Sequence, residues 1–247
     1  MAKLGVNTLS VAIKIAVKNK NRVNLIINQP PPLKVQDFSI FVQDFRILKI
    51  YWIIPSDMEA FILAGGASRR MGTDKSQLLI ERQTFTERIA ETLSRVADSV
   101  TLVGGLGSNF PRVADVYPQW GALGGIHAAL AACKSDWAIV VACDLPFVTA
   151  ELFSFLASFC LDHDAVVAIQ QDGRPQPLAA LYRVDPCLQR ATELIEAGRR
   201  RPLDLLDAVK TRWVKFDELT NLDQAESFFV NINTPSDYME AIRGHSH

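Results

Sequence analysis

The chain has 247 residues, 49% of them hydrophobic, and a formal net charge of -1. This length and composition suit one α/β domain with a full core, and the near-neutral charge argues against a protein that coats nucleic acid. No apolar run reaches the roughly 18 to 20 residues of a membrane-spanning helix. The four cysteines form no CxxC pair, which is typical of reduced thiols in the cytoplasm. We therefore expect a cytoplasmic protein that binds neither membranes nor nucleic acid.

Residues 1–57 differ from the rest of the chain in charge. They hold eight Lys or Arg residues against three acids, contain the run Pro30-Pro31-Pro32, and show no sustained helical or alternating period. We expect a poorly ordered N-terminal extension, or a start codon placed too far upstream, because Met58 stands directly before the first convincing strand. A transit peptide is the alternative, although such peptides are richer in Arg and Ser. The domain is predicted to span residues 58–247.

From Met58 onward, short apolar runs alternate with amphipathic segments of helical length, which predicts an α/β fold with a mostly parallel sheet and helices on both faces. The expected strands are 60–63, 100–103, 112–116, 137–142, 165–169, 178–182, 212–216 and 228–231. The expected helices are 85–96, 121–132, 149–160 with Thr149 as its N-cap, 186–197, 202–209 and one beginning at Pro235.

A glycine-rich, basic loop follows the first expected strand. Gly65 and Gly66 would let backbone N–H groups approach a phosphate or base closely. Three cations then suit a triphosphate: Arg69, Arg70 and Lys75. Loops at the carboxyl ends of strands line the ligand crevice of α/β sheets, so a nucleotide site is predicted here. Neither GxxxxGK[ST] nor GxGxxG is present, and a solvated basic turn is the alternative.

A carboxylate, Asp144, stands at the end of the most apolar strand. Mg²⁺ prefers oxygen ligands and is typically held by one or two carboxylates together with substrate phosphates, so we expect Asp144 to bind it. The alternative role is a helix N-cap, for which Thr149 is the better placed residue.

Three further motifs carry weaker signals. Asp115 precedes the small-residue segment Gly121–Gly125, where it could contact a ribose or base, or only stabilise a turn. Asn231 and Asn233 share one face if their segment is extended, and could bind acceptor phosphate or coordinate metal through water; alternatively, Asn233 or Thr234 merely caps the last helix. The cluster Arg199–Arg201 could hold an anionic acceptor or lie solvated at a helix end. His127, alone on a small-residue helix, is expected to be packed.

With these residues in order, the segment from about Met58 to Arg243 resembles the molybdenum cofactor guanylyltransferase family. The motifs that carry the resemblance are Leu63-Ala64-Gly65-Gly66, Arg70-Met71-Gly72, Asp74-Lys75, Asp115, Gly121–Gly125, Cys143-Asp144-Leu145-Pro146, Gly198-Arg199-Arg200 and Asn231-Ile232-Asn233-Thr234-Pro235. The resemblance implies a Rossmann-like nucleotidyltransferase sheet, GTP as cosubstrate, Mg²⁺ as metal and molybdenum-molybdopterin as acceptor. Molybdoenzymes or their chaperones would be further partners.

The resemblance also implies roles for particular residues. By position, the residues expected to contact GTP are Leu63, Ala64, Gly65, Lys75, Asp115 and Asp144, and Asp144 also matches the magnesium ligand. From the motifs themselves we add Gly66, Gly125, Asn231 and Asn233 as binding candidates, and we assign catalytic roles to Lys75, Arg69, Arg70 and Asp144. One departure concerns an asparagine that some members carry after the second strand. Here the region reads Val103-Gly104-Gly105-Leu106-Gly107, which leaves a ribose or base contact without its residue.

The implied reaction is attack by the terminal phosphate of molybdopterin on the α-phosphorus of GTP. A phosphate monoester is already an anion near neutral pH, so alignment and charge neutralisation would suffice, without a general base. The competing hypotheses are a cytidylyltransferase acting on the same cofactor or an isoprenoid precursor, a sugar-phosphate nucleotidyltransferase, and a non-catalytic pterin-cofactor carrier.

Overall fold

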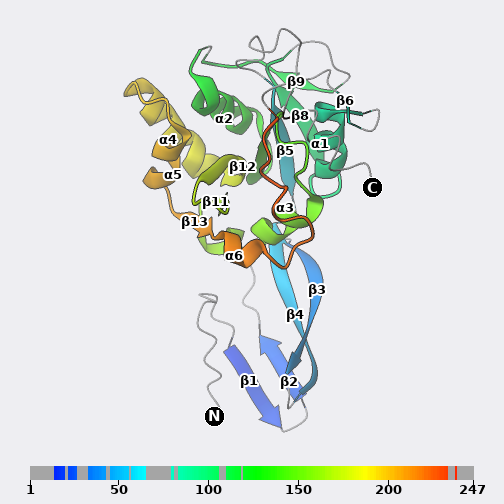
Figure 1. Cartoon of the computed structure of the whole chain (residues 1–247). Helices are drawn as coiled ribbons and strands as arrows, with labels where there is room; N and C mark the ends of the chain where they lie inside the picture. The colour runs from blue at the N-terminus through cyan, green and yellow to red at the C-terminus, as the bar shows by residue number, and fades with distance from the viewer. Residues whose placement is uncertain are drawn as a thin grey trace.

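The computed structural model describes residues 14–19, 22–26, 33–42, 45–55, 57–64, 79–80, 83–105, 110–117, 119–232 and 237 (Figure 1). For the strands before residue 55, and for residues 79–80, the description is of the backbone. None of the described helices is long and apolar enough to cross a membrane.

A seven-stranded sheet forms the centre of the molecule. Its strands are β5 (Met58–Leu63), β8 (Ser99–Val103), β9 (Arg112–Val113), β10 (Trp137–Ala142), β11 (Ala165–Ile169), β12 (Pro175–Arg183) and β13 (Thr211–Val214). They lie in the order β13-β11-β12-β10-β5-β8-β9. Strand β12 is antiparallel to both of its neighbours, and the other pairings are parallel. The predicted α/β class and mostly parallel sheet are therefore confirmed.

Helices cover both faces of this sheet. They are α1 (Phe85–Leu93), α2 (Gly121–Ala132), α3 (Ala150–Ala157), α4 (Val184–Glu196), α5 (Pro202–Ala208) and α6 (Phe216–Leu219), with a short 3-10 helix, η3 (Cys160–Asp162). Because successive strand residues point to opposite faces, Ile139 packs with α1 and α3 while Val140 packs with α2, α4 and α5. In Figure 1, α2, α4 and α5 lie to the left of the sheet and α1 to its right. All six residues of β10 are buried, as expected for a strand covered on both sides.

Local signals fix where several helices begin. Thr84 caps α1 through a capping box with Glu87, whose carboxylate accepts from the Thr84 N–H over 2.8 Å. The predicted cap at Thr149 is confirmed, since its hydroxyl oxygen accepts from the Leu152 N–H over 3.3 Å. Pro202 stands in the first turn of α5, where its missing N–H costs nothing.

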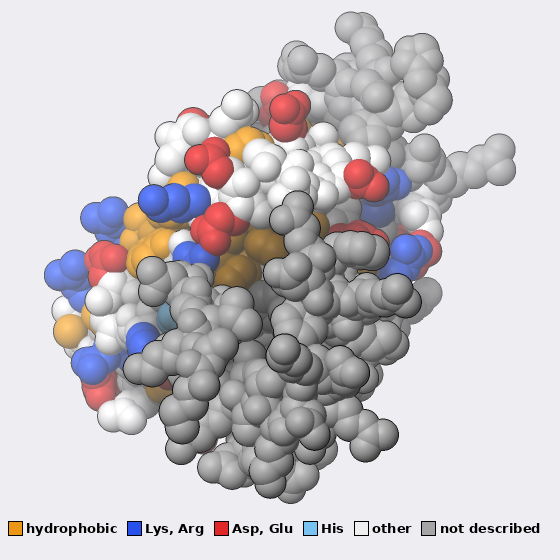
Figure 2. Space-filling model, turned by 90° about the horizontal axis from the view of Figure 1, so that it is seen from below, with side chains coloured by type: hydrophobic (Ala, Val, Ile, Leu, Met, Phe, Trp, Pro, Cys, Tyr) orange, Lys and Arg blue, Asp and Glu red, His pale blue; other side chains and the backbone are white. Residues whose placement is uncertain are grey.

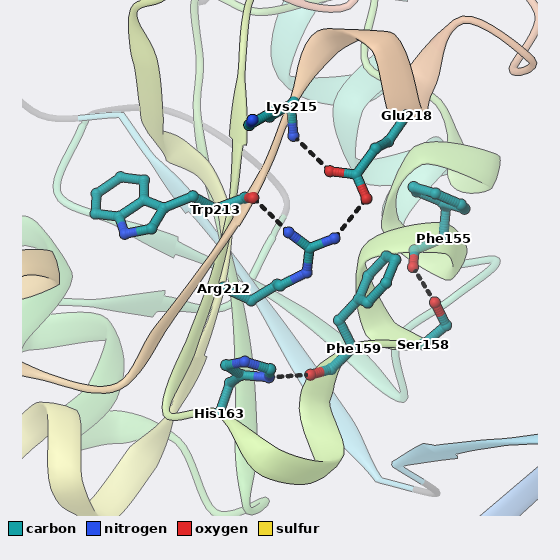
Figure 3. A network of polar contacts seen from close by, with 8 residues as sticks. All are labelled: Phe155, Ser158, Phe159, His163, Arg212, Trp213, Lys215 and Glu218. Carbon is teal, nitrogen blue, oxygen red and sulfur yellow. Dashed lines mark hydrogen bonds and ion pairs between the residues drawn. The ribbon is translucent and has the colours of Figure 1, made fainter. Parts of the chain in front are cut away.

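The edge strand β13 is held by an arginine network, drawn in Figure 3. The Arg212 guanidinium donates to the Trp213 carbonyl oxygen over 2.6 Å, pairs with Glu218 and lies 4.7 Å from the centre of the Phe159 ring. The same carboxylate accepts from the Lys215 N–H over 2.9 Å. These contacts tie β13 and α6 to the segment before η3, and they involve no residue predicted for the site.

The N-terminal segment contains regular structure that the sequence analysis did not expect. Two antiparallel hairpins occur, β1 (Lys14–Asn19) with β2 (Arg22–Ile26) and β3 (Leu33–Val42) with β4 (Phe45–Pro55). The last two strands are rich in β-branched and aromatic residues, which favour extended backbone over irregular chain. Neither hairpin joins the seven-stranded sheet, and a domain boundary at Met58 stays a prediction. A third small hairpin pairs β6 (Leu79–Ile80) with β7 (Gln83–Thr84).

Two predicted strands differ from the structure. The strand expected over 112–116 covers only Arg112–Val113, because Asp115 initiates a turn there. The strand expected over 228–231 is wrong: the Val230 N–H donates to the Ser227 carbonyl over 3.0 Å, so local turn hydrogen bonds replace a ladder while Phe228 packs into the core. The terminal helix predicted from Pro235 lies outside the described residues except for Asp237, which is helical.

The face of the molecule seen in Figure 2 carries mixed charge. Lysine and arginine side chains alternate with aspartate and glutamate around hydrophobic areas, and no single sign dominates the described part of this face. This mixture agrees with the net charge of -1.

Candidate functional site

The carboxyl ends of β5 and β10 lie side by side. Leu63 stands opposite Ala142 in the parallel register, and the Cys143 N–H donates to the Leu63 carbonyl oxygen over 3.2 Å. On the other side of β5, the Ala64 N–H donates to the Val103 carbonyl over 3.0 Å. The chain therefore leaves β5 at the edge where Asp144 follows β10. The pair β5 and β10 lies between β8 on one side and β12 on the other, so the chain extends the sheet in both directions from this point. Open α/β sheets bind ligands at the carboxyl ends of the strands where the order changes direction.

Asp144 is held at this edge by the loop that follows it. Leu145 and Phe147 are buried, and the Leu145 N–H closes a turn onto the Ala142 carbonyl over 3.3 Å. From α1, the Arg88 Nε donates to the Pro146 carbonyl over 3.1 Å. These contacts anchor the loop in the core, so the aspartate occupies a fixed place rather than a free loop tip.

The asparagine segment reaches the same edge from the far end of the chain. The Ile232 N–H donates to the carbonyl oxygen of Asp144 over 3.1 Å, and the Ile232 side chain is buried. Asn231 is exposed beside it. Although the expected strand is wrong, the hydrogen bond of Ile232 brings the adjoining Asn231 to the edge of the sheet that carries Asp144.

Asp115 lies in the turn that leads into α2. Its Oδ1 accepts from the Tyr117 N–H over 3.0 Å, which is the turn-stabilising role that the sequence left open. A Cβ on Gly124 would lie 2.9 Å from the Trp120 Cβ and 3.4 Å from the Asp115 Oδ1. The glycine therefore lets this turn pack directly against the helix.

Two more glycines shape the space around the end of β5. A Cβ on Gly125 would lie 3.1 Å from the Leu63 Cδ1, so this glycine permits close contact between α2 and β5. Gly105 has a φ of +72°, and a Cβ there would lie 2.8 Å from the Ala64 Cβ. Packing thus accounts for both glycines, and a ligand contact by Gly125 stays a prediction. The sequence drew attention to residue 105 only as part of the segment that lacks an asparagine.

The MobA-like NTP transferase domain matches residues 60–211. The chain belongs to this family. A probable molybdenum cofactor guanylyltransferase of Pelotomaculum thermopropionicum is 36% identical over 186 residues, covering 73% of this chain and 89% of the relative. A relative of the same name from Carboxydothermus hydrogenoformans is 32% identical, covering 74% and 93%.

Solved structures agree with this assignment. The molybdopterin-guanine dinucleotide biosynthesis protein A of Archaeoglobus fulgidus superposes with a TM-score of 0.66 at 26% identity, covering 76% of this chain and 99% of that one. The 2-C-methyl-D-erythritol 4-phosphate cytidylyltransferase of Thermus thermophilus has a TM-score of 0.54 at 15% identity, covering 74% and 96%, which shows a shared fold alone. The family resemblance predicted from the sequence is confirmed.

Six of the predicted site residues of this MobA-like domain lie outside the described residues: Gly65, Gly66, Arg69, Arg70, Lys75 and Asn233. Their roles stay predictions. Of the others, the structure brings Leu63, Ala64, Asp144 and Asn231 to one edge of the sheet, and Gly125 contacts Leu63 from α2.

The arginine cluster of the MobA-like domain divides into separate roles. Arg199 makes a two-pronged ion pair with Asp204, with nitrogen to oxygen distances of 3.0 and 2.8 Å. Arg200 instead lies 4.8 Å from the centre of the Trp120 ring, and its Nη1 donates to the Gln119 carbonyl over 3.5 Å. The sequence left open whether the cluster holds an anionic acceptor or lies solvated at a helix end, and it did not predict this contact with the start of α2, because the partners lie far apart in the chain.

Two buried titratable groups of the domain, His127 and Cys187, are neutral near pH 7. His127 is 6% exposed, its Nε2 lies 3.1 Å from the Thr192 Oγ1, and its ring packs edge-on against Tyr117. Burial lowers its pKa, and the nearby Asp115 carboxylate opposes this effect. The expectation of a packed histidine is confirmed. The four cysteines are free, and burial raises the pKa of Cys187 to about 12, so this thiol stays protonated.

Proposed function

We propose that this protein transfers GMP from GTP to molybdenum-molybdopterin, giving the guanine dinucleotide form of the cofactor and pyrophosphate. The main support is membership of the MobA-like family together with relatives named molybdenum cofactor guanylyltransferase over most of their length. The adjacency of Ala64 and Asp144 supports it further, since the loop with Lys75 leaves the sheet at Ala64.

The proposed reaction is an in-line displacement. An oxygen of the terminal acceptor phosphate forms a bond to the α-phosphorus of GTP, and the bond from that phosphorus to the oxygen bridging to the β-phosphate breaks. Pyrophosphate leaves with the bonding electron pair, and the attacking phosphate needs no base because it is already an anion. Lys75 with Arg69 or Arg70 would neutralise the leaving group. Asn231 and Asn233 would contact the acceptor phosphate.

Asp144 would hold Mg²⁺ in this reaction. Among the described residues, no three His, Cys, Asp or Glu side chains gather into a metal cluster. One strand-end carboxylate completed by phosphate oxygens and water is the arrangement that Mg²⁺ prefers. When bound, the ion would supply positive charge to the triphosphate.

The compartment and partners are further parts of the proposal. The free cysteines agree with a reducing compartment, so we place the reaction in the cytoplasm. Molybdoenzymes or their chaperones would receive the product.

A nucleotide competition on the full chain tests the proposal. Pyrophosphate release is measured with molybdenum-molybdopterin, Mg²⁺ and each of GTP, CTP, ATP and UTP in turn. We expect GTP to be strongly preferred. Preference for CTP would favour a cytidylyltransferase, a chemistry named for the fold neighbour from T. thermophilus. GTP binding without pyrophosphate release when acceptor is supplied would instead favour a non-catalytic carrier.

A further inference from the structure

Strand β12 begins with an irregularity at the edge of the sheet that carries Asp144. Val167 of β11 pairs with Ala180 of β12, and Ile169 pairs with Pro175. A step of two residues along β11 therefore corresponds to a step of five residues along β12. Strand β12 is antiparallel to β10, with Ala179 opposite Val141, so the residues before Ala179 lie toward the carboxyl end of β10. Bulges of this kind are common beside binding sites, where they redirect a side chain.

The bulge is held in place from within the core. The hydroxyl of Tyr182, a fully buried residue, donates to the Pro177 carbonyl oxygen over 2.7 Å. The neighbouring Gln176 is half-buried, and its side-chain Nε2 donates to the Gln170 Oε1 across the hairpin. The bulge therefore fixes Gln176 at the edge of the sheet that carries the proposed reaction.

A carboxylate at the hairpin tip determines which way both amides point. The Asp172 oxygens accept from the Gln170 Nε2 over 2.5 Å and from the Arg174 Nε over 2.6 Å. Hydrogen bonds from Arg174 and Gln170 lower the pKa of Asp172 to about 2, so the carboxylate can only accept. Gln170 must then direct its amino group toward Asp172 and its oxygen toward Gln176, which in turn must donate.

This chain of contacts leaves part of the Gln176 amide available. One N–H is used by Gln170, and among the described residues no other hydrogen bond of this side chain occurs, so one N–H and the Oε1 remain. A donor beside an acceptor in one plane matches the lactam edge of a pyrimidinone ring, where N–H and C=O are adjacent. Glutamine amides read such paired groups on nucleic-acid bases by the same geometry.

Position decides which substrate the amide faces. The glycine-rich segment follows β5 in the sequence, whereas Gln176 belongs to β12, which pairs with β10 on the side away from β5. We propose that Gln176 contacts the pyrimidinone ring of the pterin acceptor, with Gln170 and Asp172 as positioning residues. This inference rests on the proposed function, because it assumes that the acceptor is a pterin.

Steady-state kinetics of Gln176→Ala in the full chain test the inference. With GTP saturating, we expect the KM for molybdenum-molybdopterin to rise about 10-fold, in line with the loss of one or two hydrogen bonds, while the KM for GTP stays within about 2-fold. The matched control is Gln171→Ala, an exposed glutamine of the same hairpin, which should keep both values. An unchanged acceptor KM in Gln176→Ala, or an equal rise in the KM for GTP, would overturn the inference.

A second variant tests the positioning residues. Asp172→Asn keeps the size of the side chain but lets the amide of Gln170 turn over, so we expect a rise of about 3-fold in the acceptor KM with kcat unchanged. In the double variant this rise should not add to that of Gln176→Ala. Should Gln176→Ala fail to fold, the exposed Asp172→Asn decides alone, and no change in its acceptor KM counts against the inference.

The two proposals fail in distinguishable ways. If the unsubstituted chain releases no pyrophosphate from GTP with this acceptor, the proposed function is wrong and the assignment of Gln176 falls with it. If the unsubstituted chain is active but Gln176→Ala matches it in acceptor KM, only the assignment of Gln176 is wrong.

Discussion

The backbone N–H of Ile232 donates to the carbonyl oxygen of Asp144 over 3.1 Å, which joins the asparagine segment to the strand-end carboxylate. The two residues come from distant parts of the chain, yet both are held by buried neighbours, Phe228 on one side and Leu145 on the other. The backbone of Asp144, the proposed metal ligand, and that of the segment ending at Ile232, which includes Asn231, are therefore fixed relative to each other.

Asp144→Ala should lower kcat by about 100-fold or more, because it removes the carboxylate that would hold Mg²⁺ against the triphosphate. Pyrophosphate release with GTP and acceptor is the measurement. Asp223→Ala, an exposed aspartate far along the chain, is the control and should retain full activity. Activity like that of the unsubstituted chain in Asp144→Ala would refute the metal assignment. Chelation of the divalent cation should abolish turnover reversibly in the unsubstituted chain.

Gly105→Ala should destabilise the fold and weaken GTP binding. The residue has a φ of +72°, and its new Cβ would lie 2.8 Å from the Ala64 Cβ, where the nucleotide loop begins. Gly173→Ala is the matched control, since its φ is +84° but nothing lies within 4 Å of the new Cβ. In urea unfolding, the strained backbone should lower the free energy of unfolding by about 1 kcal/mol in both variants, and the close contact with Ala64 should lower it further in Gly105→Ala alone. Equal losses in the two variants would contradict the contact with Ala64.

Arg200→Ala and Arg199→Ala should separate the roles of the cluster. Arg200→Ala removes the cation from the face of Trp120 and loosens the turn before α2. We expect the free energy of unfolding to fall by about 0.5 to 1 kcal/mol. Arg199 makes a two-pronged pair with Asp204, whose side chain is only 10% exposed, so its loss should also lower stability but leave the surroundings of Trp120 unchanged. Urea unfolding followed by tryptophan fluorescence measures both. No change in the urea midpoint of Arg200→Ala would show that the stacking on Trp120 contributes nothing.

His127 should make stability fall in mildly acidic solution. Burial lowers its pKa in the folded state, so between the unfolded value of 6.5 and the lower folded value the unfolded chain binds more protons. The contribution of the neutral ring is therefore complete above pH 6.5 and is lost as the pH falls through the folded pKa. Urea midpoints measured from pH 7.5 to 5 should show this decline.

A comparison with His127→Gln isolates the contribution of the ring. Glutamine does not titrate and can still donate to Thr192, so the decline below pH 6.5 should be smaller in the variant. An identical pH profile in the two proteins would exclude His127 as its source.

Elements with strong local signals agree with the prediction from sequence. Both Trp137–Ala142 and Gly121–Ala132 have the expected bounds, because a continuous apolar run ended by Cys-Asp-Leu-Pro and a small-residue segment opened by glycine leave little choice. The strand-end position of Asp144 followed from the same run. Its position beside Leu63 was expected because the carboxyl ends of neighbouring parallel strands meet at the same edge of a sheet.

Features that depend on contacts between distant residues could not be predicted. The aromatic pair Phe228-Phe229 has the composition of a strand, yet turn hydrogen bonds and burial of one ring decide its backbone. The antiparallel direction of β12 and its bulge depend on pairing with two other strands, and the stacking of Arg200 on Trp120 joins separate loops. Residues 1–57 were expected to be poorly ordered because no period persists along them, although short stretches between residues 14 and 55 form hairpins.

The complete burial of β10 has a consequence for how relatives with this fold could diverge. A substitution anywhere in that strand disturbs packing on one face of the sheet or the other. The position of Asp144 at the end of the strand is therefore constrained by the same residues that form the core. The hairpin tip at 171–174 is exposed and can change without that penalty. New acceptor preferences should therefore evolve in this hairpin while the phosphate chemistry stays constant.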